Sequence, residues 1–137
     1  MSSQDEIRRT LAEFGRFLDE RRFTEWSELF TDEATFGETA GRATILAKML
    51  EGELATQPEL FRKHATVNST ILVEGDHATA VSDLLLFERE TDGAWLMRFG
   101  LYEDTLRQVG DRWLIQRRQL SWTANPIDDG NPVIGQG

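Results

Sequence analysis

The sequence predicts an α+β domain in which helices come first and a curled antiparallel sheet follows. Up to about residue 54, apolar side chains recur with helical spacing. From residue 60 to residue 123, apolar and polar side chains alternate, and turn sequences such as Asp92-Gly93 separate the alternating stretches. Helices and strands that are segregated along the chain are typical of α+β proteins. We expect the helices to pack across the concave side of the sheet.

The length and composition indicate a single globular domain. The chain has 137 residues, of which 39% are hydrophobic and 28% are charged, and this is enough to form one hydrophobic core. We place the domain at residues 1–123. Residues 124–137 are rich in Pro, Gly, Asp and Asn, and we interpret them as a loose C-terminal tail.

Composition also argues against several function classes. A net charge of −9 repels phosphate backbones and anionic lipids, so we expect no nucleic acid and no membrane partner. The absence of cysteine excludes disulfides and thiol chemistry. Two histidines without ligand spacing make a metal site improbable. No apolar signal segment or long apolar run is present, which indicates a cytoplasmic protein.

The first helix is expected over residues 4–22, with Ser3 as its cap and Glu6 completing a capping box. Its apolar stripe consists of Ile7, Leu11, Phe14 and Leu18. Shorter elements follow: a helix from Thr24 that includes Trp26, Leu29 and Phe30, a strand at 34–36, a loop at 37–41 and a helix at 42–54.

Asp19 lies on the flank of the first helix, next to the small residues Ala12 and Gly15. Small neighbours leave space, and a pocket wall needs space beside its carboxylate. The alternative is a solvated surface aspartate beside Arg22.

Four strands are expected at residues 60–73, 77–89, 94–109 and 112–123, forming an antiparallel meander. On the third of these strands an apolar row would form a large exposed patch unless a second subunit covered it, which predicts a homodimer. The row consists of Trp95, Met97, Phe99 and Leu101. Arg117 and Arg118 on the last strand point to opposite faces, so one of them could reach the pocket, but we interpret the pair mainly as charge balance for the acidic surface.

The first strand presents two different rows of side chains. The apolar row is Ala65, Val67, Ile71 and Val73, and the polar row is His64, Thr66, Asn68 and Thr70. A histidine in a polar row that lines a cavity is a candidate proton-transfer group. An exposed strand with a solvated polar face is the alternative.

Several segments resemble the SnoaL-like group of the nuclear-transport-factor-two-like (NTF2-like) superfamily. They are Thr24-Glu25-Trp26, Lys63-His64 with Asn68, Gly75-Asp76-His77-Ala78, Gly100-Leu101-Tyr102-Glu103-Asp104 and Gly110-Asp111-Arg112-Trp113. The resemblance covers about residues 4–123. It implies a cone-shaped, cystatin-like α+β barrel: a curved antiparallel sheet wrapped by the N-terminal helices around a deep, mostly apolar pocket, commonly in a dimer.

The resemblance also implies a catalytic pair. Scytalone dehydratase and hexachlorocyclohexane dehydrochlorinase, two branches of the superfamily, remove a proton with an Asp–His pair at positions similar to Asp19 and His64. His64 would be the base and Asp19 would orient its ring. Where such dehydratases often have a tyrosine in the first helix, this chain has Phe14, so Tyr102 on the sheet is the remaining candidate phenol.

Two functions remain open at this stage. The first is a cofactor-independent lyase or isomerase, similar to a dehydratase or polyketide cyclase, that abstracts a proton from a small apolar organic substrate. Its substrate would contact Phe14, Trp26, Asn68 and Tyr102. The second is a non-catalytic dimer of the same fold that binds a small molecule or acts as a scaffold.

Overall fold

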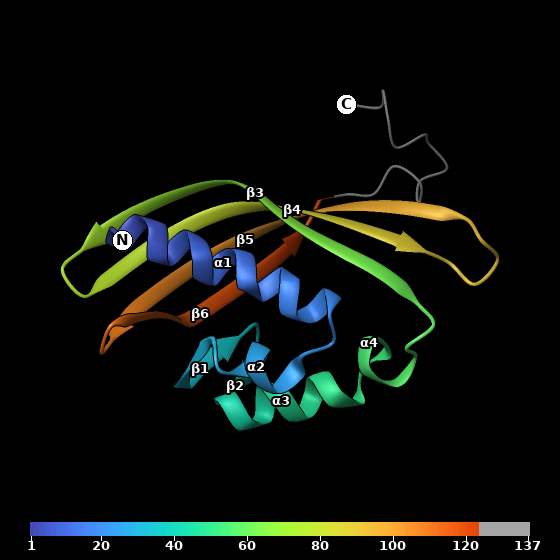
Figure 1. Cartoon of the computed structure of the whole chain (residues 1–137), viewed down its shortest axis with the longest axis horizontal. Helices are drawn as coiled ribbons and strands as arrows, with labels where there is room; N and C mark the ends of the chain where they lie inside the picture. The colour runs from blue at the N-terminus through green and yellow to red at the C-terminus, as the bar shows by residue number, and fades with distance from the viewer. Residues whose placement is uncertain (124–137) are drawn as a thin grey trace.

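The computed structural model describes residues 1–123, which form a curved sheet with helices on its concave side (Figure 1). The expected tail at 124–137 lies outside the described residues. In chain order the elements are α1 (Ser3–Asp19), α2 (Phe23–Ser27), β1 (Phe30–Phe36), β2 (Thr39–Ala40), α3 (Arg42–Glu51), α4 (Glu53–Thr56), β3 (Phe61–Glu74), β4 (His77–Arg89), β5 (Trp95–Val109) and β6 (Arg112–Trp122).

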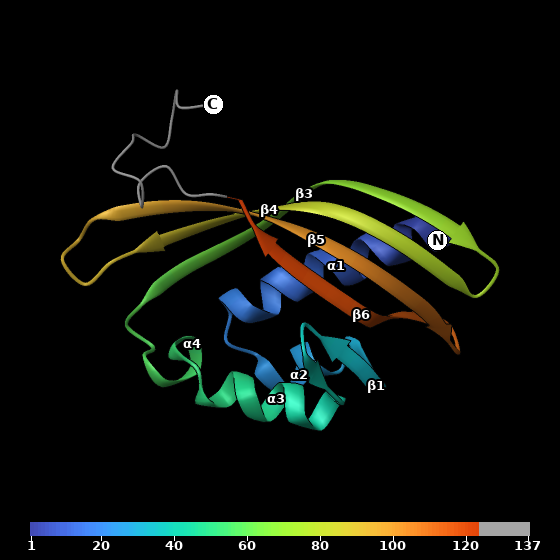
Figure 2. The same ribbon diagram turned by 180° about the vertical axis from the view of Figure 1, so that it is seen from behind.

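The predicted α+β class and the antiparallel meander β3–β4–β5–β6 are confirmed. The sheet is nevertheless mixed, because β1 lies parallel to β6, with Thr35 opposite Arg117. Its order is β2-β1-β6-β5-β4-β3, so β2 and β3 are open edges and the sheet does not close (Figure 2). Among the described residues, no helix is long and apolar enough to cross a membrane.

Several sequence-based boundaries differ from the structure: α1 ends at Asp19 rather than at residue 22, and the loop expected at 37–41 contains β2. The helix expected to contain Phe30 ends at Ser27, and Phe30 instead begins β1 in the buried core. The helix expected at 42–54 is divided at Gly52 into α3 and α4. The cap of α1 is Ser2 rather than Ser3, since the Asp5 backbone N–H donates to the Ser2 hydroxyl at 3.1 Å.

A bulge in β3 divides this strand into two halves with opposite orientation. Val67 lies opposite Asp83 and Thr70 opposite Val81, so β3 has one residue more than β4 in this interval. Asn68 occupies the extra position with a left-handed φ of 53°. The single apolar row expected on this strand is therefore wrong: Ile71 and Val73 pack on the core, on the face opposite Ala65 and Val67.

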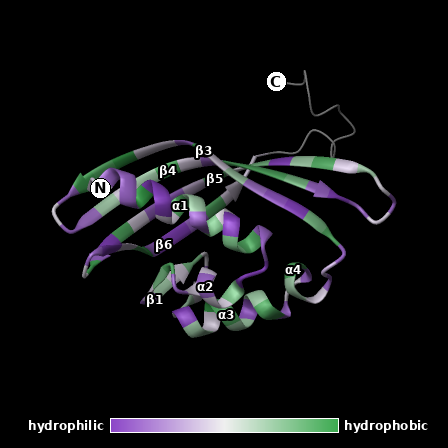
Figure 3. Ribbon diagram, viewed as in Figure 1, coloured by the Kyte–Doolittle hydropathy of each residue, from purple (hydrophilic) through white to green (hydrophobic). Residues whose placement is uncertain are grey.

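Aromatic side chains form the centre of the core between α1 and the sheet. The Phe14 ring makes edge contacts with Trp26, Phe30, Phe36 and Tyr102, with ring centroids 5.4 to 5.9 Å apart. The predicted stripe of α1 is buried as expected. Hydrophilic and hydrophobic segments alternate along the strands (Figure 3), which is consistent with a sheet covered on its concave face.

Candidate active site

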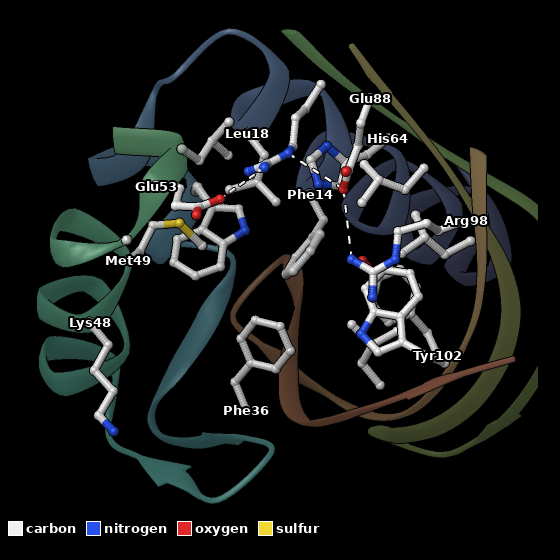
Figure 4. A pocket seen from close by; sticks show the side chains of 18 of the residues that line it. Phe14, Leu18, Phe36, Lys48, Met49, Glu53, His64, Glu88, Arg98 and Tyr102 are labelled. Atoms are coloured by element: carbon white, nitrogen blue, oxygen red, sulfur yellow. Dashed lines mark hydrogen bonds and ion pairs between the residues drawn. The ribbon is translucent and has the colours of Figure 1, made fainter. Parts of the chain in front are cut away.

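A cavity of about 670 Å³ lies between the concave face of the sheet and helices α1 to α4 (Figure 4). This volume lies within the range of small-molecule pockets. Much of its wall is apolar, formed by side chains such as Phe14, Leu18, Phe36, Met49, Leu86 and Leu120. His64 and Tyr102 line the same cavity.

The structure brings Asp19 and His64 together at the end of α1. The His64 Nδ1 atom lies 2.8 Å from Asp19 Oδ1, and the His64 backbone N–H donates to the same oxygen at 2.9 Å. Both side chains are about 10% exposed. Since a carboxylate only accepts hydrogen bonds, the neutral imidazole carries its proton on Nδ1 and keeps a lone pair on Nε2.

Gly15 allows α1 to approach β3 closely enough for this pair to form. A Cβ atom at this position would lie 3.1 Å from the His64 carbonyl oxygen and 3.2 Å from the His64 Cβ. The space predicted beside Asp19 is therefore occupied by the strand, and Ala12 is exposed rather than part of a pocket wall. The lack of a side chain at Gly15 therefore permits close contact between α1 and β3.

Two positively charged neighbours contact this end of α1 from the other side. Lys63 Nζ lies 3.4 Å from Asp19 Oδ2. Arg21, which follows α1 with a left-handed φ of 57°, donates to the backbone carbonyl oxygens of Asp19 and Leu60. The expected alternative, a solvated Asp19 beside Arg22, is not observed, because the Asp19 side chain is only about 10% exposed and Arg22 binds Glu20 and Glu25. The end of α1 is thus tied directly to the start of β3.

Phe14, Trp26 and Tyr102, which we expected to contact the substrate, all line the cavity and are buried. Burial is the main cause that raises the pKa of Tyr102 to about 12, so its phenol stays protonated and can donate a hydrogen bond. Asn68 does not belong to the site. The bulge leaves it exposed, and its side chain donates to Asp83 Oδ2 at 2.9 Å.

Sequence reasoning missed a charged cluster in the cavity wall. Glu88, with a side chain only 9% exposed, lies 3.5 Å from Arg62 Nε and 3.7 Å from Arg98 Nη1. The period-two alternation of β4 could have indicated it, because Glu88 follows Leu84 and Leu86 on the face that lines the cavity.

A second buried pair also escaped prediction. Arg118 donates to both carboxylate oxygens of Asp104, at 2.7 and 2.9 Å, and both side chains are fully buried. The guanidinium carbon lies 3.6 Å from the centre of the Tyr102 ring and 4.2 Å from that of Phe14. Arg118 therefore does not balance the surface charge, since it supports the two rings from beneath.

The arrangement can accept a proton from a molecule in the cavity. Nε2 of His64 is the available base, Asp19 stabilises the imidazolium that would form, and the surrounding wall excludes much of the solvent. Within residues 1–123, the His, Asp and Glu side chains form no group of three that could hold a metal ion.

The chain is similar to known proteins over most of its length. A family model for the SnoaL-like domain matches residues 1–119. No curated protein matches the chain in sequence. A candidate scytalone dehydratase from Novosphingobium aromaticivorans has a similar structure, with a TM-score of 0.76 and 25% identity over 88% of this chain and 84% of that one.

Two further solved structures share the fold. An NTF2-like protein with a cystatin-like fold from the same organism has a TM-score of 0.74, with 25% identity over 87% of this chain and 80% of that one. A protein from Catenulispora acidiphila, solved in complex with S-DNPA, has a TM-score of 0.75, with 23% identity over 87% and 92% of the two chains. The predicted cystatin-like fold is thereby confirmed.

Proposed function

The chain belongs to the SnoaL-like domain family, and on this premise we propose that it is a cofactor-independent lyase or isomerase. It removes a proton from a small, largely apolar organic substrate. The observation that supports this most strongly is the 2.8 Å contact between His64 Nδ1 and Asp19 Oδ1 in the wall of the cavity.

The proposed reaction begins with neutral His64. Its Nε2 takes a proton from a carbon next to a carbonyl group, and the electrons of the broken C–H bond form the new C=C bond of an enolate. Asp19 stabilises the positive charge that the ring acquires. The proton then returns to another carbon in an isomerisation, or to a departing hydroxyl group in a dehydration.

The side chains of the cavity wall suit a substrate that contains a ring. Phe14 and Trp26 provide apolar contact, and the protonated phenol of Tyr102 provides a hydrogen-bond donor. Phe14 cannot donate a hydrogen bond from α1, so Tyr102 takes this role from β5. The candidate scytalone dehydratase with a similar structure supports the same class of chemistry.

Non-catalytic binding of a small molecule is the alternative. The ligand-bound relative from Catenulispora acidiphila supports a pocket of this kind as a binding site. A pair of side chains more than about 4 Å apart could not share a proton, and the short contact between Asp19 and His64 therefore favours catalysis over binding alone.

Turnover by the His64→Ala variant tests the proposal. We expect wild type to convert a member of a panel of dehydration and isomerisation substrates. The variant should lose about 10²–10⁴-fold in rate. Thermal melts of both proteins should differ little, because His64 lines a cavity.

The matched control is His77→Ala. His77 also contacts an aspartate, with Nδ1 2.7 Å from Asp76 Oδ1, but it is exposed at the start of β4. Its removal should leave turnover unchanged. If His64→Ala is as fast as wild type, the catalytic role fails. If no protein in the set turns over any substrate but the cavity still binds the compounds, the binder is supported.

We also propose that the chain forms a homodimer through the convex face of the sheet. Trp95 is 60% exposed on that face, and Phe61, 47% exposed, packs against it with ring centroids 5.5 Å apart. Exposed aromatic pairs of this kind favour association. Light scattering at micromolar concentration should give twice the mass of the chain, and a monomer mass would exclude the dimer.

A further inference from the structure

Arg98 lies across the sheet from His64, in the same row of paired residues. His64 on β3 is opposite Leu86 on β4, and Leu86 is opposite Arg98 on β5. All three line the cavity. Neighbouring strands are about 4.8 Å apart, so the backbones of His64 and Arg98 are separated by roughly 10 Å, with Leu86 between them. A substrate ring lying on Leu86 would have the base at one edge and a guanidinium at the other.

The guanidinium of Arg98 is fixed in place, yet its donors remain available. Its central carbon lies 4.1 Å from the centre of the Trp122 ring, and Nη1 lies 3.7 Å from Glu88 Oε1. That separation is too long for a hydrogen bond. Within residues 1–123, the guanidinium of Arg98 donates no hydrogen bond to any side chain or backbone group.

Glu88 does not fully neutralise this charge, because it is shared between two arginines (Figure 4). It lies 3.5 Å from Arg62, which also binds Glu53 at 3.0 Å. The nearly buried carboxylate therefore holds both guanidinium groups at the wall. Arg98, whose side chain is 37% exposed, is the one with the longer ionic contact.

We propose that Arg98 binds the substrate oxygen that becomes negatively charged when His64 removes the proton. The proposal rests on the proposed function and specifies its substrate class: an enolisable ring ketone or a related carbonyl compound. In that ring, the acidic C–H lies toward β3 and the oxygen toward β5.

Removal of the proton converts the carbonyl compound into an enolate. The C–H bond breaks, its proton goes to His64 Nε2, and the electron pair forms the C=C bond. The π electrons of the carbonyl group move to its oxygen. Arg98 then donates charge-assisted hydrogen bonds to this oxygen, and such bonds are stronger to the enolate than to the neutral carbonyl. Arg98 thus stabilises the transition state more than the substrate.

Binding of 4-nitrophenol tests the role of Arg98 without a need for turnover. Its phenolate mimics an enolate oxygen on a ring, and its neutral and anionic forms have different visible spectra. In mildly acidic buffer, where the free probe is mostly neutral, wild type should bind the phenolate and produce its spectrum. The Arg98→Met variant should lose at least about tenfold of the preference for phenolate over phenol, the effect expected for a hydrogen bond to a charged group.

Three further variants define the result. Lys48→Met removes another cation from the cavity wall and should keep the preference within about twofold, because Lys48 lies on α3 and not in the sheet row of His64, Leu86 and Arg98. If Arg98→Met is unstable, Arg98→Lys takes its place in the comparison. It keeps the positive charge and should retain part of the preference for phenolate. His64→Gln should still bind the phenolate, which would show that binding of the anion does not depend on the base.

The proposal is overturned if wild type shows no preference for the phenolate, or if Arg98→Met retains it in full. These outcomes are separate from failure of the proposed function. If His64→Ala keeps its turnover while Arg98→Met loses the phenolate, the oxygen-binding role of Arg98 stands and only the identity of the base is wrong.

Discussion

Two pairs beside the cavity join a carboxylate to a basic side chain. Asp19 contacts the imidazole of His64 at 2.8 Å, and Asp104 contacts the guanidinium of Arg118 at 2.7 Å. Their surroundings differ. Asp104 and Arg118 are fully buried beneath Phe14 and Tyr102, and two parallel hydrogen bonds join them. His64 instead lines the cavity and contacts its carboxylate through one ring nitrogen.

This difference separates a structural pair from one that can transfer a proton. Arginine does not lose its proton in proteins, so Arg118 keeps one charge state and fixes the floor of the cavity. Histidine changes its charge near neutral pH, so His64 can act as a base. A carboxylate bound to arginine therefore keeps a fixed charge partner, whereas a carboxylate bound to histidine beside a cavity has a partner that can gain or lose a proton.

The largest expected effect is on the free energy of unfolding, when the aspartate of each pair is replaced in turn by asparagine. Asp104→Asn leaves the buried Arg118 without a counter-charge and should lower the free energy of unfolding by about 3–5 kcal/mol. Asp19→Asn should lower it by only about 1 kcal/mol, because the amide oxygen can still accept the His64 backbone N–H. Urea denaturation of the two variants measures both values.

Equal losses of stability in these two variants would contradict the comparison. The double variant Asp104→Leu with Arg118→Met provides a control, since it removes both charges together. It should recover part of the stability lost in Asp104→Asn.

A smaller effect is expected from Gly15→Ala, which acts on the Asp19–His64 pair alone. Alanine favours the helix by about 1 kcal/mol, but its Cβ would be pressed against the backbone of His64. Overpacking of this kind costs about 1–3 kcal/mol, so a net loss of roughly 1 kcal/mol is expected with displacement of His64. Thermal melts and turnover of Gly15→Ala should both decline.

Arg16→Ala is the matched control for this prediction, because Arg16 is the next residue of α1 and is exposed. It should change neither quantity appreciably. A Gly15→Ala variant with wild-type stability and turnover would show that β3 can move away without disturbing the pair.

An effect that appears only at alkaline pH concerns Tyr102, which lines the cavity and stacks on Arg118. It is the only tyrosine of the chain, so tyrosinate absorbance reports on it alone. In the native protein its pKa should be about 12, raised by burial from 10.0. In urea it should return to the ordinary value.

The sign of the linked effect on stability follows from these values. Between pH 10 and about 12, the unfolded chain has lost the phenol proton while the folded chain still holds it, so stability should fall as pH rises. Below pH 10 this group should contribute no pH dependence. Ionisation of native Tyr102 near pH 10 would mean that the phenol is open to water.

Much of the fold was predictable because the spacing of apolar residues along whole helices and strands determines it. The stripe of α1 and the β4 strand, placed at residues 77–89, were identified from hydrophobic spacing and turn residues. The parallel pairing of β1 with β6 was missed, since Phe30 fits a helical face as well as a strand and only contact with Ile115 distinguishes them. Local sequence contains no information about a partner 85 positions away.

The site was predictable in part. Asp19 and His64 were proposed as a pair from resemblance, and the structure places them in contact. The prediction that Asn68 belongs to the site was wrong, because a single extra residue in β3 turns its side chain to the other face of the sheet. Asp104 and Arg118 were missed because charged residues are presumed to be exposed until a specific buried partner is known.

The proton on the His64 ring is the most direct test of the central claim, and it requires no substrate. Nitrogen-15 NMR of the imidazole, recorded at a pH where the ring is neutral, distinguishes its two tautomers. The account requires the proton on Nδ1, donated to Asp19 Oδ1, with Nε2 unprotonated in the cavity. A neutral ring with its proton on Nε2 would contradict the account, since it could not accept a proton from a substrate there.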